Sequence, residues 1–251
     1  MAGLAVTAGV AAGYFAAARL GLSMAFVAEQ VTVVWPPTGI AVAALVAYGP
    51  VAALGVFAGA LAANVTIGEP VPAAACIAAG NTVAGVCAWW LLRRAGFGAA
   101  LDRIWDVMAL LGLAGAAASV VSATAGVLTL CLSGLQPWSA FDGLWWIWWL
   151  GDLMGVVLVA PLLLTLSRRA RWPAARTAEA ALLFAALAAV ALVVFAGRLP
   201  AVPAGQQLAY AVFPFVIWAA LRFRQRETAG AMALIAVVAV WGTVRGFGPF
   251  G

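Results

Sequence analysis

One carboxylate stands in an otherwise apolar stretch of this sequence. Asp152 lies within WWIWWLGDLMG, residues 145–155, and no other charged residue occurs between Asp142 and Arg168. A carboxylate surrounded by hydrocarbon is costly unless it is paired, protonated or hydrated. Such a group can sense protons or recognise a polar ligand, and it can equally form a structural hydrogen bond between helices. Both interpretations stay open for Asp152.

Missing residue types exclude several kinds of chemistry. The chain has no His, which removes Ser–His and Cys–His nucleophile pairs, the usual zinc sites and a His-ligated haem. The three cysteines, Cys76, Cys87 and Cys131, lie in apolar segments, where packing side chains are expected rather than a disulfide or metal site. An intramembrane enzyme would need several convergent titratable groups at one depth, and Asp152 is the one such group that the sequence places firmly inside a membrane helix. We therefore expect no catalytic residue, no metal and no cofactor.

Composition predicts the class of fold. The 251 residues are 67% hydrophobic and 8% charged, whereas a soluble domain carries about 25% charged residues. Apolar runs long enough to cross a bilayer recur along the whole chain, which indicates an all-α, polytopic transmembrane helical bundle. We expect a single integral-membrane domain over residues 1–251, with the lipid bilayer as its first partner. The net charge of +5 comes from arginines at helix ends, and nucleic-acid binding is not expected.

Nine apolar helical segments are predicted. The second and third are short and are separated by Gly49-Pro50. Thirteen helical residues span about 20 Å, less than the roughly 30 Å hydrocarbon core, so these two form either a tilted pair or a re-entrant hairpin. The nine segments cover residues 2–24, 36–48, 50–66, 70–92, 104–132, 142–166, 175–197, 205–221 and 228–244.

Arginine clusters predict the orientation. They lie at residues 93–94, 168–176 and 222–226, each separated from the next by two predicted crossings. Two crossings return the chain to the same side, and the positive-inside rule makes that side the cytoplasm. The N-terminus is then cytoplasmic and residue 251 lies on the outer side of a bacterial inner membrane.

This orientation places two polar residues at similar depth. Asp152 and Asn81 each lie ten or eleven residues from the predicted outer end of their helix, which is about 15 Å and close to the bilayer midplane. Asp152 should therefore face the bundle interior, where an amide such as that of Asn81 could bond it. Gly151 and Gly155 flank Asp152 as a small-xxx-small pair, which lets another backbone approach closely.

The stretch VVWPPTG, residues 33–39, is a second unusual feature. Pro36 and Pro37 are preorganised for the start of a helix. Free N–H groups just after them would favour an anion or the polar head of a ligand, and short helices that open at a cavity recur in membrane ligand sites. The simpler alternative is an ordinary helix start, with Trp35 at the lipid interface.

Further polar and aromatic residues belong to the predicted outer mouth. Glu29 and Asn64 lie near apolar segments and are candidates for a cavity wall, whereas Glu69 and Asp142 are expected to be solvated loop residues. The tryptophans at 145, 146, 148 and 149 cover more than one helical face, so some contact lipid and others line a pocket. The predicted ligand-binding set is Glu29, Trp35, Pro36, Pro37, Asn64, Asn81, Trp148 and Asp152.

An ordered series of motifs resembles the first class of membrane-associated sensor domains, the MASE family. The series is VWPPTGIAVAAL, AGALAANV, AAGNTVAGVCAWWLLRR, SATAGV, WWLGDLMGVVLVAPLLL, FPFVIWAALRF and GFGPF, which together run from about residue 10 to 251. The resemblance implies a membrane sensory input module that precedes a cytoplasmic histidine kinase, diguanylate cyclase or phosphodiesterase. It also implies that a membrane protein can be the partner, and it supplies no list of binding residues. The positions that fall on the family motifs are Trp35, Pro36, Pro37, Gly39, Asn64, Asn81, Gly151, Asp152, Gly155 and Pro161.

The resemblance also bears on what lies beyond residue 251. Family members commonly continue past GPF with one more membrane helix into the cytoplasm, which agrees with an outer position of residue 251. We therefore expect an output domain that this chain lacks, either in a parent protein or absent from a stand-alone version. Alternative functions are a small transporter or channel, which an inverted repeat would indicate, and a scaffold for another membrane protein. No internal repeat is detected.

Overall fold

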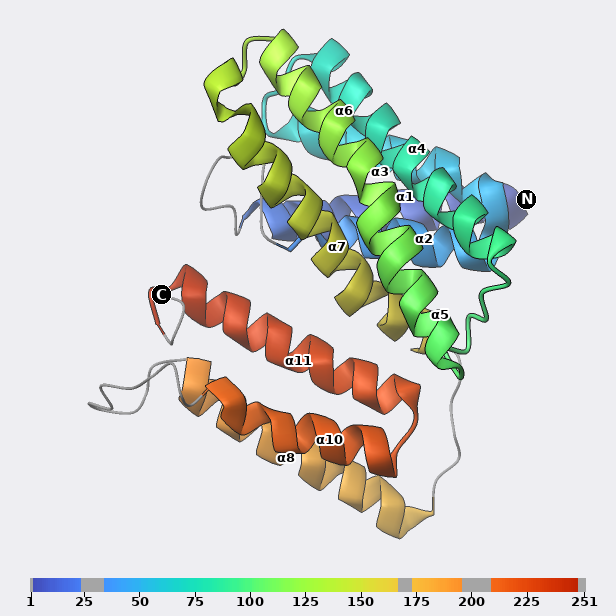
Figure 1. Cartoon of the computed structure of the whole chain (residues 1–251), viewed down its shortest axis with the longest axis vertical. Helices are drawn as coiled ribbons and strands as arrows, with labels where there is room; N and C mark the ends of the chain where they lie inside the picture. Colours follow the sequence, from blue (N-terminus) through green and yellow to red (C-terminus); the bar gives the residue numbers. More distant parts are fainter. Residues whose placement is uncertain (1, 24–33, 167–172, 196–208, 248–251) are drawn as a thin grey trace. The chain divides into compact units, whose positions relative to one another are not determined.

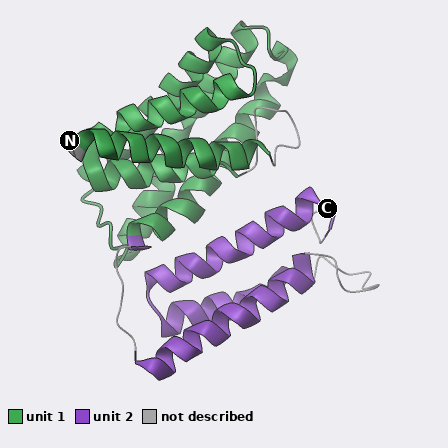
Figure 2. Ribbon diagram, turned by 180° about the vertical axis from the view of Figure 1, so that it is seen from behind, with its two compact units in different colours: residues 1–164 green, residues 165–251 purple. Residues whose placement is uncertain are grey.

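The computed structural model describes residues 2–23, 34–166, 173–195 and 209–247, and every regular element in these ranges is helical. The chain divides into two compact units, residues 1–164 and 165–251 (Figure 2). The first unit contains α1 (Ala2–Leu22), α2 (Pro36–Tyr48), η1 (Gly49–Val51), α3 (Ala52–Thr66), α4 (Val71–Arg94), α5 (Ile104–Ala109), η2 (Leu110–Ala117), α6 (Ala118–Leu132), η3 (Trp138–Ala140) and most of α7 (Phe141–Leu166). The second contains α8 (Ala174–Phe195), η4 (Ala209–Val212), α10 (Phe213–Arg222) and α11 (Gln225–Val244).

The predicted helical segments are confirmed over the described residues; residues 24, 196–197 and 205–208 of these segments lie outside that part of the chain. Among the described residues, seven helical runs are long and apolar enough to cross a membrane, and residues 209–222 form a shorter apolar helix. Residues 36–66 count as one of the seven runs although they hold two helices. The protein is thus a multi-span helical membrane protein. One internal detail differs from the prediction: the segment 104–132 is not α-helical throughout, because Leu110–Ala117 forms a π-helix.

Helices α2 and α3 are short and form a hairpin that lies along α1 (Figure 1). At one end, Gly21 of α1 lies against the Trp35 ring, and Arg19 Nη1 donates to Thr66 Oγ1 at 3.5 Å. At the other end, Gly3 lies against Val51, next to the turn at η1. Helix α2 is therefore antiparallel to α1 and α3 is parallel to it. Gly49 makes the turn with a φ of 72°, a left-handed conformation that glycine adopts without steric cost.

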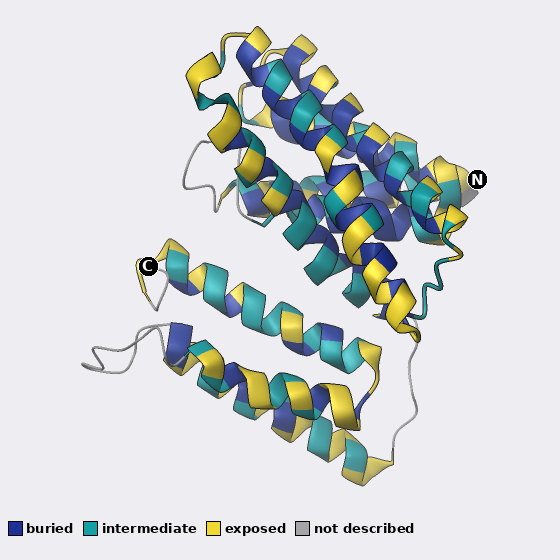
Figure 3. Cartoon of the chain, viewed as in Figure 1, coloured by how far each residue is buried: buried dark blue, intermediate teal, exposed yellow. Residues whose placement is uncertain are grey.

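Small residues let the helices of the first unit approach closely. A Cβ added to Gly55 would lie 2.6 Å from Thr7 O, and one added to Gly59 would lie 2.7 Å from Ala11 O, both across the α1–α3 contact. Lipid is as apolar as a helix surface, so association in a bilayer depends on such close packing rather than on hydrophobic burial. Buried residues accordingly line the faces on which the helices of this unit meet (Figure 3).

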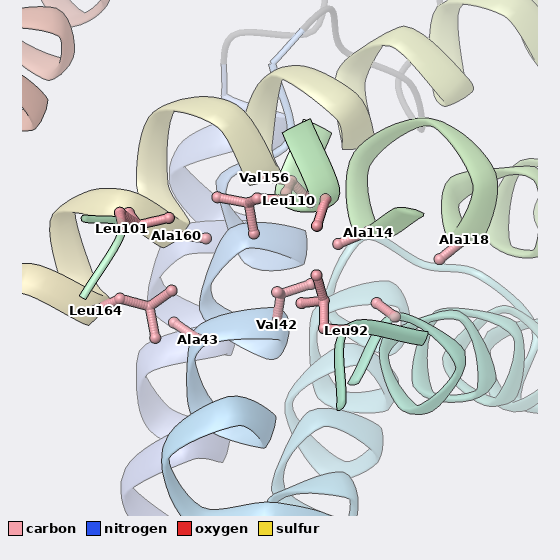
Figure 4. Packing of buried hydrophobic residues seen from close by; sticks show 12 residues of the cluster. Val42, Ala43, Leu92, Leu101, Leu110, Ala114, Ala118, Val156, Ala160 and Leu164 are labelled. Carbon is pink, nitrogen blue, oxygen red and sulfur yellow. The ribbon is translucent and has the colours of Figure 1, made fainter. Parts of the chain in front are cut away.

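An aliphatic cluster joins α2, α4, η2 and α7. Val42 and Val156 are fully buried in it, and Leu92 is 1% exposed (Figure 4). Because a tightly packed interior resists displacement of its elements, this cluster fixes the position of α7 relative to the start of α2. That contact positions the candidate site described below.

The second unit is held together by an apolar cluster and by charged groups at one end. Leu183, Leu187 and Ala219 are fully buried in the cluster. Arg222 Nε lies 2.8 Å from Glu179 Oε1, and Trp218 Nε1 donates to the same oxygen at 3.2 Å. These contacts join the beginning of α8 to the end of α10.

The predicted orientation leads to a test with reporter fusions. Reporters placed in residues 95–101 and 168–176 are expected to be active in the cytoplasm, because the arginine clusters lie there. Reporters in the 133–137 loop, one crossing away, are expected to be active only on the outer side. The opposite pattern at residues 95–101 would contradict the assigned orientation.

Candidate functional site

The carboxylate of Asp152 is fully buried in the middle of α7. Its Oδ1 accepts a hydrogen bond from the Thr38 hydroxyl of α2, and its Oδ2 accepts one from the Ser122 hydroxyl of α6. The indole of Trp148, one turn earlier on α7, also interacts with it. The prediction that Asp152 faces the bundle interior is confirmed. Its two hydroxyl donors were not predicted, since the amide of Asn81 was the suggested partner.

Local sequence explains how Thr38 reaches this carboxylate. Pro36 and Pro37 occupy the first two positions of α2, as predicted, and Thr38 is the third. Just before them, Trp35 N donates to Gly151 O at 2.9 Å, so the start of α2 is bonded to the backbone of α7 immediately before Asp152. This direct bond holds Thr38 beside the acid.

Gly155, one member of the predicted glycine pair on α7, performs the predicted role. A Cβ on Gly155 would lie closer than 3.0 Å to Trp35 O, and a Cβ on Gly39 would lie closer than 3.0 Å to Gly155 O. Real Cβ atoms essentially never come within that distance. The backbones of α2 and α7 therefore touch through Gly39 and Gly155, and no other residue type fits without a shift.

The predicted anion site at the start of α2 needs a correction. Pro36 and Pro37 have no N–H, and the next N–H, that of Thr38, donates to Trp35 O at 3.2 Å. It is not free for an external ligand. The carboxylate of Asp152 instead lies at the positive end of the α2 dipole, where it accepts a hydrogen bond from the Thr38 hydroxyl. Negative charge is stabilised at such a position.

Tryptophans near the site divide between interior and surface. Trp148 is 8% exposed, and its ring lies over Gly126 of α6, where an added Cβ would be 2.5 Å from the ring. Gly126 follows Ser122 by one turn, so both contacts come from one face of α6. Trp149 Nε1 donates to Ala116 O at 2.8 Å within the π-helical run, and Trp146 is 60% exposed.

Tyr14 of α1 completes the cluster and was not predicted from the sequence. It is 1% exposed, and its hydroxyl interacts with the side chains of Trp35 and Asn81 and with the charge of Asp152. Tyr14 Oη and Trp35 Nε1 are both buried, yet neither has a hydrogen bond of regular geometry. The one polar aromatic residue in the Gly- and Ala-rich first helix was the available signal. Asn81, itself 8% exposed, thus belongs to the site through Tyr14.

The remaining predicted residues lie elsewhere. Asn64 is buried at the end of α3, where its Nδ2 donates to Ala60 O at 2.8 Å. Asp142 is exposed, as expected for a loop residue, but Glu69 is only 6% exposed, so the expectation of a solvated side chain is wrong for Glu69. Glu29 lies outside the described residues.

We name the group Tyr14, Trp35, Thr38, Asn81, Ser122, Trp148 and Asp152 the Asp152 cluster. Its members come from α1, α4, α6 and α7, and from α2 with the residue before it. A polar cluster inside an apolar bundle is typical of functional sites in polytopic membrane proteins, because intramembrane ionisable groups are costly to keep.

Comparison with protein families shows more specifically which class of membrane protein this chain belongs to. The MASE1 family model matches residues 4–251, which covers both units, and the chain belongs to this family. MASE1 is a membrane-associated sensory domain of signalling proteins. Comparisons with curated proteins and with solved structures gave no match.

Proposed function

We propose that this chain is a sensory input module whose Asp152 cluster receives a small ligand or a membrane partner from the outer side. The observation that carries the proposal is the placement of the Asp152 carboxylate between Thr38 of α2 and Ser122 of α6. One side chain thereby connects three helices. The Tyr14 hydroxyl and the Trp35 indole N–H, both buried without a regular hydrogen bond, are the groups that an incoming polar molecule would bond.

A ligand transmits a signal only if it binds two helix arrangements unequally. In the arrangement described here, the start of α2 is bonded to α7 at Gly151 and Asp152. A ligand that bonds Trp35 or Tyr14 competes with these contacts and favours a second position of α2. Because α2 and α7 touch through glycines, a small displacement at this point changes their packing. Helix α7 then carries the change toward the cytoplasmic end of the bundle.

The cellular context follows from the family and from the arginine distribution. We place the protein in a bacterial inner membrane with its N-terminus in the cytoplasm and residue 251 on the outer side. A following helix connects the module to a histidine kinase, a diguanylate cyclase or a phosphodiesterase, and so to two-component or cyclic di-GMP signalling. The module itself acts by binding and not by catalysis.

A signalling assay tests the role of the cluster. In a full-length relative that carries an output enzyme, the change equivalent to Asp152→Asn is expected to shift output severalfold while membrane insertion stays normal. Asn keeps the shape of the side chain, but only its oxygen accepts a hydrogen bond, so one of the two hydroxyl groups can no longer donate to this side chain. The matched control is Asp142→Asn, an exposed carboxylate at the start of the same helix.

The result that contradicts the proposal is equally direct. If both Asp152→Asn and Asp152→Leu give wild-type output with wild-type dependence on stimulus, the cluster has no part in sensing. A shift in Asp142→Asn as large as that in Asp152→Asn would point to surface charge instead.

A further inference from the structure

The turn between α3 and α4 closes with a Schellman motif. Gly68, at a φ of 90°, is the left-handed residue, and its N–H donates to Val65 O at 3.1 Å. The N–H of the next residue, Glu69, donates back to Asn64 O at 3.3 Å. In this motif the residue after the left-handed position folds back over the last turn of the helix, where an apolar contact usually forms. Here the two positions are held by Glu69 and Asn64.

Within the described residues, three other helices end with the same pair of bonds, and they show which type of residue fills the position of Glu69 there. After α4 the residue is Phe97, bonded to Leu92 O, and after α6 it is Leu135, bonded to Leu130 O. In each case both members of the pair belong to one apolar cluster. After α11 it is Phe247. Glu69 therefore occupies a position that is apolar in the other three motifs of the described residues.

This geometry buries the Glu69 side chain without a partner. The residue is 6% exposed, and both carboxylate oxygens are buried with no hydrogen bond. Helices α2, α3 and α6 carry no charged residue, and the arginines of α4 are at its opposite end. Arg19 of α1 donates to Thr66, and no described cation forms an ion pair with Glu69. The other titratable groups on the helices of this bundle, apart from the arginines, are Tyr14, Tyr48, Cys76, Cys87, Asp106, Cys131, Asp142 and Asp152.

We propose that Glu69 is a proton-binding site that keeps the α3–α4 turn closed when protonated and opens it when the carboxylate ionises. Protonation neutralises the Glu69 carboxylate, and a neutral carboxyl group is far less costly to bury than a charged one. Burial accordingly raises the pKa of Glu69, from an ordinary value of 4.5, to about 7. A divalent metal is a poor alternative, because no group of three or more His, Cys, Asp or Glu side chains that could hold one occurs in the described part of the chain.

The sign of the pH effect follows from the direction of this shift. The folded protein holds the Glu69 proton up to a higher pH than the unfolded chain does, so folding is favoured by protonation. This contribution is fully present below the unfolded value of 4.5 and is lost as pH rises through about 7. Ionisation then drives the side chain toward water, which requires the turn to open. The site is thus a pH-sensitive element at the end of the bundle opposite Arg93, separate from the Asp152 cluster.

Infrared spectroscopy of the purified protein in lipid nanodiscs tests the proposal. The carbonyl band of a protonated carboxyl group is expected to disappear with a midpoint near neutral pH. In protein labelled with ¹³C-glutamate this band should move to lower frequency, which separates it from any band of Asp152. Glu69→Gln should remove it, while the control Asp142→Asn should retain it. If the labelled band is absent at pH 6, or persists in Glu69→Gln, the proposal is wrong.

A second variant, Glu69→Leu, provides a test that does not depend on the result with Glu69→Gln. Glu69→Leu places an apolar residue at this position, as in the other three described motifs, which have Phe97, Leu135 and Phe247 there. It is expected to make thermal unfolding less dependent on pH than in the wild type, with the larger stabilisation at alkaline pH. An equal effect of Glu69→Leu at acidic and alkaline pH would show that Glu69 does not titrate in this range.

Discussion

Gly155→Ala is expected to disrupt the folded contact between α2 and α7. The added methyl group would lie closer than 3.0 Å to Trp35 O, and Trp35 cannot simply move away because its N–H is bonded to Gly151 O at 2.9 Å. Separation of the two backbones would also remove the Thr38–Asp152 hydrogen bond. Overpacking of a tight core costs about 1–3 kcal/mol, and the coupled loss of the bond places Gly155→Ala at about 3 kcal/mol.

The measurement is the unfolding midpoint of the purified protein in detergent, together with the fraction that elutes as a monodisperse species. Gly143→Ala is the matched control, since it makes the same change near the start of α7, where an added Cβ meets nothing within 4 Å. Gly143→Ala should stay within about 0.5 kcal/mol of the wild type. Equal midpoints for the two variants would show that α2 does not lie against Gly155.

Asp152→Leu is the second large effect. It removes the acceptor for two hydroxyl donors and leaves the Thr38 hydroxyl without its partner, whereas Ser122 Oγ retains Ser119 O at 3.1 Å. A buried polar group that loses its partner costs about 1–3 kcal/mol. We expect destabilisation by about 3 kcal/mol for Asp152→Leu and about 1 kcal/mol for Asp152→Asn, which keeps one acceptor.

A double-mutant cycle separates the hydrogen bond from general effects of the substitution. Thr38→Val should destabilise the wild type but have little further effect in the Asp152→Leu background, because the bond is already lost. Thr129→Val is the control, since the Thr129 hydroxyl donates to Ala125 O within its own helix at 2.7 Å and its effect should add to that of Asp152→Leu. Additive effects for Thr38→Val would contradict the described bond.

Both variants also bear on signalling, because they act on the same contact from opposite sides. Gly155→Ala pushes α2 away from α7, and Asp152→Leu removes the bond that holds Thr38 to α7. If the sensory proposal is right, the two changes should move the output of a full-length relative in the same direction. Opposite directions would mean that separation of α2 from α7 is not the transmitted change.

Several features could be predicted from the sequence alone because each depends on a local rule. Backbone groups in a bilayer must be satisfied within a helix, so apolar runs predicted the helices. Pro36 and Pro37 predicted the start of α2, and the Gly49-Pro50 break predicted two short helices. Gly151 and Gly155 predicted a close backbone approach. The cost of a charge in hydrocarbon predicted that Asp152 faces inward, and its burial confirms this.

Tertiary structure decided which side chains meet. Thr38 is 114 residues from Asp152 in the chain and Ser122 is 30 residues away, and no periodicity in the sequence pairs them. Helices that are apolar on all sides give no sign of which face turns inward, because lipid and protein interior are equally apolar. The inward position of Tyr14 was missed for this reason. Glu69 was misjudged because the Schellman turn, rather than its position in a loop, decides where its side chain lies.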